Sequence, residues 1–179
     1  MPDGMGAKGM VTAGYVKPLA VPHGLEAIKR TFGDFTWKPM APPTIDIDDV
    51  WESDNLVRIR NVCGTKIDIR LHRLAVEPFQ SALEAAMKAA PKYKVRLLGG
   101  YCARQMKTLD PKKQAKAPLS THAWGIAFDI NWDKNPFASV LKTDLPPEFV
   151  AEFKRWGWSW GGDWSRSKDA MHFQLASGY

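Results

Sequence analysis

The spacing of hydrophobic positions along the chain predicts three helices. A short amphipathic helix is expected over residues 25–32, where apolar side chains recur at helical spacing and a glycine follows. The strongest helical pattern runs over residues 74–90 and is stopped by Pro91. A third helix is expected over residues 146–156, because two prolines open it and Gly157 closes it.

Alternation of apolar and polar side chains predicts the strands. Residues 55–62 and 66–72 alternate on either side of a glycine, which indicates two strands or one hairpin. Residues 94–101 form a further candidate strand that ends in two glycines. Strict alternation over residues 126–131 and 170–176 predicts two more strands near the end of the chain.

The remaining segments are predicted to be connections. Residues 1–20 are rich in glycine and are expected to form a flexible N-terminal arm. Residues 34–55 are rich in Pro and Asp, which indicates a surface connection with at most short strands, and residues 105–119 form a basic loop that prolines interrupt. Strands and helices follow one another without βαβ regularity, so we expect an α+β fold. It should be a single domain over residues 21–179, with a central antiparallel sheet and flanking helices.

Composition narrows the class of protein. With 179 residues, 45% of them hydrophobic and 25% charged, the chain is typical of a globular protein. It has no run of 18 apolar residues and no signal-peptide pattern, so we expect no membrane insertion and synthesis in the cytoplasm. Cys63 and Cys102 are expected to be reduced thiols, although one long-range disulfide stays open.

The formal net charge of +6 favours an anionic partner, either nucleic acid or an anionic cell-wall polymer. The chain has no basic recognition helix, zinc-finger spacing or aromatic RNA-binding motif. We therefore expect no nucleic-acid partner.

Two of the predicted strands each present one metal-binding side chain among small or polar neighbours. In residues 126–131 the apolar side chains alternate with Asp129, and in residues 170–176 they alternate with His172. His122 can reach the same face if the chain turns before the first of these strands. Two imidazoles and one carboxylate with an open fourth position form a ligand set for catalytic zinc. A packed histidine or an exposed aspartate is the ordinary alternative for each, so spacing alone leaves the question open.

Two motifs resemble those of a family of zinc peptidases. Residues 120–129, STHAWGIAFD, match all five fixed positions of the pattern SxHxxGxAxD. Residues 169–173, DAMHF, are similar to the second motif of the family, and residues 156–164, WGWSWGGDW, and 100–104, GYCAR, resemble further segments. The family contains D-Ala-D-Ala carboxypeptidases, D-Ala-D-Ala dipeptidases and L-alanyl-D-glutamate endopeptidases, and many of its phage members are endolysins.

The resemblance implies a fold and a site. The fold would be that of hedgehog and D-Ala-D-Ala peptidase domains. Asp169 would act as general base, and Arg104 would steady charge on the substrate or the transition state. Ser120 and Trp124 are candidates for substrate binding. The ligands implied for one Zn²⁺ per chain are His122, Asp129 and His172.

Some positions depart from the family pattern or have two interpretations. Gln174 stands where the family often has glutamate, and its amide oxygen is expected to accept a hydrogen bond from a ligand histidine instead. The tryptophans of residues 156–164 are expected either to pack in the core or to line a groove for glycan or peptide. The loop 105–119 is longer and more basic than the pattern, which leaves substrate preference open. His23 and His72 match no ligand position and are expected to be structural or exposed.

Together these observations predict a zinc-dependent peptidase that hydrolyses amide bonds of peptidoglycan stem peptides, with L-alanyl-D-glutamate endopeptidase as the expected specificity. The alternatives are a D-Ala-D-Ala carboxypeptidase of the same family and an inactive relative that binds wall peptides. The third alternative, nucleic-acid binding, rests on the net positive charge alone. We expect a monomer that acts on the cell wall after holin-type release.

Overall fold

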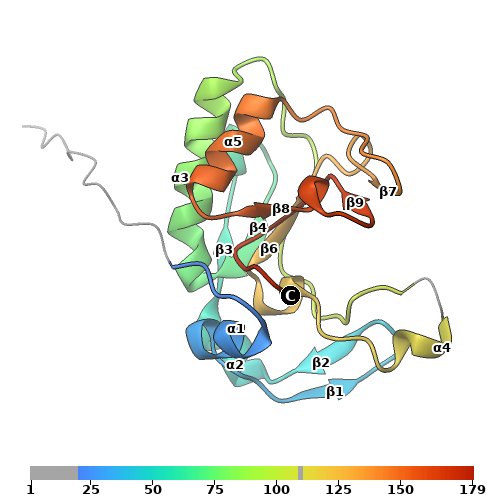
Figure 1. The fold of residues 1–179 in the computed structure, drawn as a ribbon. Coiled ribbons are helices and arrows are strands. Elements are labelled where there is room, and N and C mark those ends of the chain that lie inside the picture. The colour runs from blue at the N-terminus through green and yellow to red at the C-terminus, as the bar shows by residue number, and fades with distance from the viewer. Residues whose placement is uncertain (1–19, 109–110) are drawn as a thin grey trace, which may run out of the picture.

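The computed structural model describes residues 20–108 and 111–179 (Figure 1). The predicted arm over residues 1–20 lies outside this part of the chain, except for its last residue. Among the described side chains, Cys102 is a free and exposed thiol, as expected for a reduced cysteine.

An antiparallel sheet of four short strands lies at the centre of the fold. Its order is β5 (Leu98–Gly99), β6 (Ala127–Ile130), β10 (His172–Gln174) and β8 (Ser159–Trp160). Three two-stranded antiparallel sheets accompany it: β1 (Trp37–Pro39) with β2 (Ile45–Ile47), β3 (Leu56–Ile59) with β4 (Ile69–His72), and β7 (Phe137–Ala138) with β9 (Lys168–Asp169). The second of these pairs confirms the predicted hairpin.

The helices lie on one face of the central sheet and at one end of the molecule. The longest, α3 (Arg73–Ala89), packs beside α5 (Pro147–Arg155) on the sheet (Figure 1). The others are α1 (Leu25–Phe32), α2 (Asp49–Asn55), the short α4 (Pro111–Gln114), and three 3₁₀ turns, η1 (Val62–Gly64), η2 (Thr121–Trp124) and η3 (Gly161–Asp163). The predicted α+β class with antiparallel strands is confirmed. No helix in the described part of the chain is long and apolar enough to cross a bilayer.

Aromatic rings fill the space between the sheet and the two long helices. Phe128 of β6 and Phe173 of β10 are opposite each other in the register, and their rings stack with centroids 5.1 Å apart. Phe79 of α3 and Phe153 of α5 contact the Phe128 ring at 5.1 and 5.0 Å. Because strand side chains alternate, the intervening residues of β6 and β10 must project from the opposite face of the sheet.

The prediction for residues 34–55 is wrong at its end, where the chain forms the helix α2. The Asp48 carboxylate caps this helix by accepting hydrogen bonds from the backbone amides of Val50 and Trp51, at 2.9 and 3.1 Å. Trp51 is buried, so tertiary packing stabilises a segment whose composition is that of a loop.

The strand predicted over residues 94–101 is reduced to β5. Before it, the side chain of Asn131 replaces a strand partner, because its Oδ1 accepts hydrogen bonds from the amides of Arg96 and Leu97 at 2.8 and 2.9 Å. Asn131 itself has a φ of 43°, a conformation that asparagine tolerates better than most residues. The backbone groups are therefore satisfied without a ladder.

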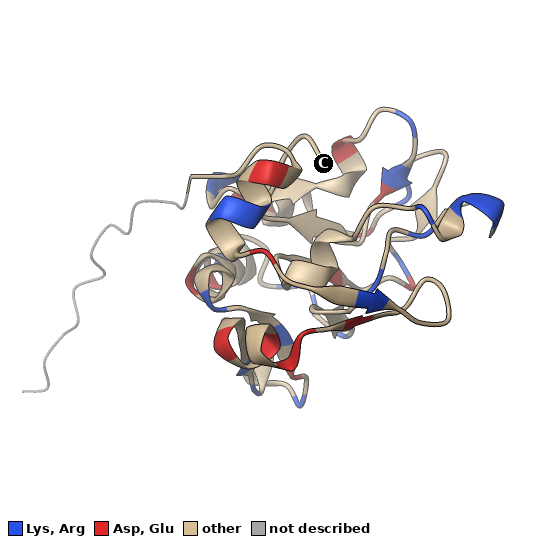
Figure 2. Cartoon of the chain, turned by 90° about the horizontal axis from the view of Figure 1, so that it is seen from below, with Lys and Arg blue, Asp and Glu red and all other residues tan. Residues whose placement is uncertain are grey.

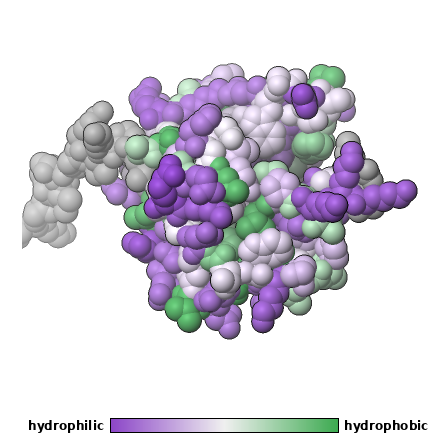
Figure 3. All heavy atoms as spheres, turned by 60° about the horizontal axis from the view of Figure 1, so that its bottom comes forward, coloured by the Kyte–Doolittle hydropathy of each residue, from purple (hydrophilic) through white to green (hydrophobic). Residues whose placement is uncertain are grey.

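The described parts of the basic segment, residues 105–108 and 111–119, make more hydrogen bonds than the predicted solvated loop would. The side chain of Gln105 is buried and its Nε2 donates to the carbonyl of Ala117 at 2.9 Å, which ties the two ends of the segment together. The short helix α4 lies between these ends and projects with its lysines from one edge of the molecule (Figures 2 and 3).

His72 is structural and buried. Its Nδ1 accepts a hydrogen bond from the amide of Leu74 at 3.1 Å and so caps α3, while its Nε2 donates to the carbonyl of Phe32 at 3.0 Å. Both ring nitrogens are thus used by a neutral imidazole, which ties α1 to the start of α3. Burial outweighs the contact with the Phe32 carbonyl and lowers the pKa of His72 to about 4.

We predict a stability loss in mild acid that depends on His72. Because its folded-state pKa lies below the unfolded value of about 6.5, the unfolded chain takes up a proton first as the pH falls. This contribution to stability is complete above about pH 6.5 and declines by roughly 2 kcal/mol between pH 7 and pH 5. Urea unfolding of wild type and His72→Gln at both pH values measures it, and an equal pH dependence in the two proteins would contradict it.

Candidate metal centre

The three predicted ligands lie together on the face of the central sheet opposite the aromatic core. His122 Nε2 is 3.2 Å from His172 Nδ1 and 3.3 Å from Asp129 Oδ1, and His172 Nδ1 is 3.1 Å from the same oxygen. A tetrahedral zinc ion with ligands at about 2.0–2.1 Å separates its ligand atoms by about 3.3 Å. The nearly equilateral triangle therefore has the size that one zinc ion requires.

Strand register places two of these side chains. His172 of β10 is directly opposite Asp129 of β6, so both project from the same face at neighbouring positions. His122 arrives from the preceding turn η2, where the Ser120 hydroxyl accepts a hydrogen bond from the His122 amide at 3.4 Å. The turn thus brings the third ligand beside the pair.

Gly125 makes this turn possible. It ends η2 with a φ of 67°, which favours glycine, and its carbonyl accepts a hydrogen bond from the amide of His72 at 2.8 Å. A Cβ at this position would lie 2.7 Å from that amide nitrogen. The glycine of the first motif is therefore required by backbone conformation and by the close approach of β4.

Each histidine uses its outer nitrogen to donate a hydrogen bond to the protein. His122 Nδ1 donates to the carbonyl of Gly100 at 2.7 Å, and His172 Nε2 donates to Gln174 Oε1 at 3.0 Å. The same Gln174 oxygen accepts from the Thr121 hydroxyl at 3.1 Å. With these protons in place, the inner nitrogens of both rings point at the same Asp129 oxygen, an arrangement that a cation at the centre, either a metal ion or a proton, satisfies.

The electrostatics of the triangle favour positive charge at its centre. Burial opposes ionisation of Asp129, yet its hydrogen bonds with the two imidazoles hold the pKa of this carboxyl well below its usual range. Burial of His172 acts to lower its pKa. The hydrogen bond and the attraction to the Asp129 carboxylate act more strongly, so the pKa of His172 is raised. In the described part of the chain these residues form a group that can hold a metal ion.

Asp169 lies next to this group with one oxygen unpaired. Its Oδ1 is buried and has no hydrogen-bond partner among the described residues. Burial raises the pKa of Asp169, while the nearby His172 and Arg104 side chains act in the opposite direction. A buried carboxylate oxygen without a partner is uncommon and indicates a place for a ligand or a proton.

The path of the chain between Asp169 and His172 differs from the expected one. A strand is predicted from residue 170 onward, but residues 168–169 form the strand β9, residues 170–171 form a turn, and β10 begins only at His172. Gly161 of η3 packs against β9, because a Cβ there would lie 2.4 Å from the Asp169 carbonyl oxygen. The tryptophan-rich segment thus holds Asp169 in place.

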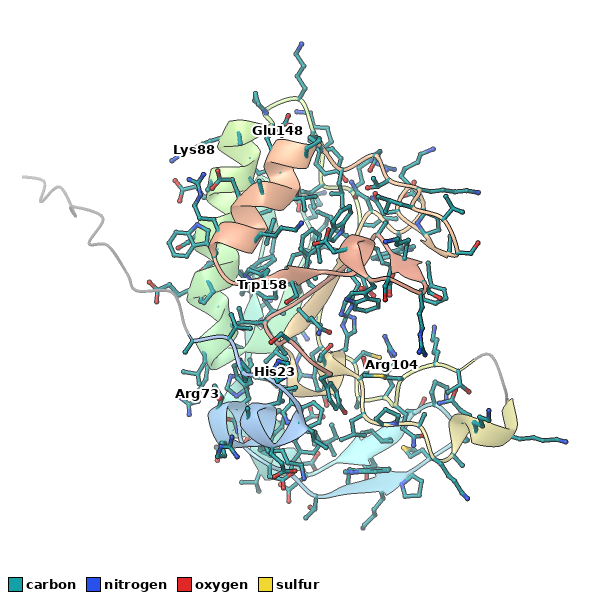
Figure 4. The ribbon with its side chains drawn as sticks, in the orientation of Figure 1. His23, Arg73, Lys88, Arg104, Glu148 and Trp158 are labelled. Atoms are coloured by element: carbon teal, nitrogen blue, oxygen red, sulfur yellow. The ribbon has the colours of Figure 1, made fainter. Side chains whose placement is uncertain are left out.

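Arg104 is labelled in Figure 4 between the α4 segment and the strands that carry the metal centre. Its Nη1 donates to the carbonyl of Gln105 at 3.2 Å, and its backbone bridges to Thr44. The guanidinium is half-buried and close enough to influence the Asp169 carboxyl, but it bonds to none of the three metal-ligand candidates.

Ser120 and Trp124, the two substrate-binding candidates, lie beneath the site rather than on its surface. Ser120 is buried and caps η2. Trp124 is fully buried, and its indole N–H donates to the carbonyl of Gly33 at 3.1 Å. Both residues therefore shape the turn that carries His122.

Two groups that support the histidines, the Gly100 carbonyl and the Thr121 hydroxyl, were not predicted from the sequence. A backbone carbonyl leaves no signal in residue type, so the first could not be found from sequence. Thr121 lies inside the first motif but at one of its variable positions, and only the fold brings it to Gln174.

Comparison with known families gives an independent result. Residues 113–175 match the model of a family described as D-alanyl-D-alanine carboxypeptidase. This match confirms the resemblance that the two motifs indicate. It includes the three metal-ligand candidates and Asp169, whereas Arg104 lies outside it. No solved structure matches the chain, so the resemblance to the hedgehog and D-Ala-D-Ala peptidase fold stays a prediction.

We predict that the amide of Gln174 sustains metal affinity. Gln174→Leu removes the acceptor of the His172 ring proton, and loss of such a support typically costs 10–100-fold in metal affinity. Gln174→Glu keeps an acceptor at the same position and is the matched control. Competition with a chromogenic chelator measures the affinity, and an unchanged affinity in the leucine variant would contradict the role.

Proposed function

We propose that this protein is a zinc-dependent peptidase that hydrolyses amide bonds of peptidoglycan stem peptides. The observation that carries the proposal is the triangle of His122, Asp129 and His172 beside the buried, unpaired oxygen of Asp169. The match of residues 113–175 to a peptidase family supports it. The net charge of +6 suits attraction to an anionic wall.

The side chains divide the chemistry among them. A Zn²⁺ ion held by the triangle would supply Lewis-acid activation of water and of the scissile carbonyl. Asp169 accepts a proton from the water whose oxygen bonds to the carbonyl carbon, and it returns that proton to the amine nitrogen when the C–N bond breaks. Arg104 presents a planar set of donors to a substrate carboxylate or to the oxyanion of the transition state.

For the bond that is cut, we propose the amide between L-Ala and D-Glu, as in an endolysin-type endopeptidase. The likeness of residues 156–164 and 169–173 to phage members of the family supports this choice. D-Ala-D-Ala carboxypeptidase activity is the second candidate, because it is the activity that describes the matched family. The complete ligand set and Asp169 argue against an inactive, wall-binding relative.

We further propose that the protein works as a monomer on the cell wall, after synthesis in the cytoplasm and holin-type release. Its basic residues between 104 and 116 would add attraction to wall polymers at low ionic strength.

We predict one zinc ion per chain, lost on removal of a ligand. His172→Ala takes away one of three protein ligands and should reduce zinc to well below stoichiometric content after dialysis. Elemental analysis of the purified protein measures it. His23→Ala, which changes an exposed histidine paired with Ser177, is the control and should retain one zinc. Full zinc retention in His172→Ala would show that His172 is not a zinc ligand.

We predict that digestion of purified peptidoglycan releases products cleaved after L-Ala. The variant Asp169→Ala should lower the rate of this digestion by about a hundredfold or more, because it removes a positioned base. Mass spectrometry of the muropeptides identifies the bond, and elemental analysis should find zinc retained in the variant.

Asp163→Ala provides the matched control for this experiment. Asp163 is an exposed aspartate of the same segment, paired with Lys154 at 2.6 Å, and its removal should leave the rate near that of wild type. Loss of only terminal D-Ala would instead identify the carboxypeptidase, and a near-normal rate in Asp169→Ala would mean that another group takes the proton.

A further inference from the structure

Three large aromatic side chains stay exposed around the metal centre. Trp132, Phe137 and Trp164 are 43%, 51% and 36% exposed, whereas Trp158 and Trp160 of the neighbouring segment are buried in the core. We call the three exposed residues the aromatic rim. Exposed rings gathered at one place mark a binding surface more often than rings scattered singly.

The first member of the rim lies on the face of the sheet that carries the ligands. A Cβ on Gly99 would lie 3.7 Å from the Trp132 ring. Gly99 is opposite Asp129 in the β5–β6 register, and side chains of opposed residues share a face. The indole of Trp132 therefore lies beside the position from which Asp129 projects.

The other two members adjoin the remaining site residues. The Trp164 ring contacts the His172 ring, with centroids 5.4 Å apart. Phe137 of β7 is directly opposite Asp169 of β9 in the register. Each ring of the rim thus lies next to a different residue of the centre. A substrate that reaches the metal centre therefore passes next to the rim.

We propose that the aromatic rim binds the amino-sugar ring to which the stem peptide is attached, an inference that rests on the proposed function. The residues of a stem peptide near its sugar end carry methyl groups or carboxylates, which cover little of an indole or phenyl face. A pyranose has a flat C–H face of about the size of a six-membered aromatic ring. Stacking on partly exposed rings buries both faces without requiring a deep pocket.

The position of the rim agrees with cleavage near the sugar. A residue spans at most about 3.6 Å along an extended chain. The L-Ala–D-Glu bond is one residue from the sugar, whereas the terminal D-Ala-D-Ala bond of a pentapeptide is four residues, or about 14 Å, away. A rim in contact with His172 and opposite Asp169 fits the shorter separation. Sugar binding by the rim therefore favours the endopeptidase over the carboxypeptidase.

The test compares two soluble substrates with the same stem peptide, one free and one linked to its N-acetylated disaccharide. Phe137→Leu keeps an apolar side chain but loses the flat ring, and Phe137→Trp keeps a ring. We expect the ratio of kcat/KM for the linked substrate to that for the free peptide to fall about five- to tenfold in Phe137→Leu and in Trp132→Ala. Phe137→Trp should restore a ratio close to that of wild type.

Trp37→Ala is the matched control. Trp37 of β1 is 38% exposed, similar to the rim residues, but it pairs with Ile47 in a different sheet. Its replacement should leave the ratio unchanged. An unchanged ratio in both Phe137→Leu and Trp132→Ala would overturn the proposal, whether kcat/KM stays the same on both substrates or falls equally on both.

Titration of the disaccharide alone, followed by tryptophan fluorescence, separates the rim from the proposed function. Saturable quenching whose dissociation constant rises in Phe137→Leu, a variant that keeps every tryptophan, supports the rim even if the zinc-loaded protein cleaves neither substrate, an outcome that would reject the proposed function. Cleavage of the free peptide without any preference for the linked one, together with no disaccharide binding, would reject the rim and leave the peptidase intact.

Discussion

The pairing of β6 with β10 is the constraint on which the site depends. Its register sets His172 opposite Asp129 on one face and Phe173 opposite Phe128 on the other. A shift of one residue would exchange the two faces and place the carboxylate among aromatic rings, where an unpaired charge is strongly unfavourable. The stacked phenylalanines, packed against α3 and α5, therefore fix the register that brings the candidate metal ligands together.

The remaining parts of the centre are added to this pair by backbone contacts. Gly125 lets the chain turn against β4 so that His122 completes the triangle, and the carbonyl of Gly100 orients the ring of His122. Gln174, two residues after His172 on the same strand, orients the other ring. Ligand atoms held in this way lose little freedom when a metal binds, and preorganisation of this kind raises affinity.

The sequence predicted the site better than it predicted the surrounding structure, for physical reasons. Periodicity identified the strands of Asp129 and His172, because one of their faces is apolar, and the motifs supplied His122. The helix α2 escaped notice because its stability comes from the Asp48 cap and the burial of Trp51 rather than from an amphipathic repeat. Which aromatic residues are exposed could not be predicted either, since burial depends on packing between segments distant in sequence.

The two faces of the central sheet contribute to the stability of the fold with opposite sign. On the core face, stacked rings gain from leaving water and need no partners. On the other face, the unpaired Asp169 oxygen costs roughly 1–3 kcal/mol, and the inner nitrogens of the two histidines converge with one Asp129 oxygen. Unfavourable groups of this kind occur where a bound ligand supplies the missing interactions. The stability gained by burial on the core face offsets their cost while no ligand is bound. The location of unsatisfied polar groups, together with the two motifs, is therefore the physical argument for the proposal that this face of the sheet binds a cation and a substrate.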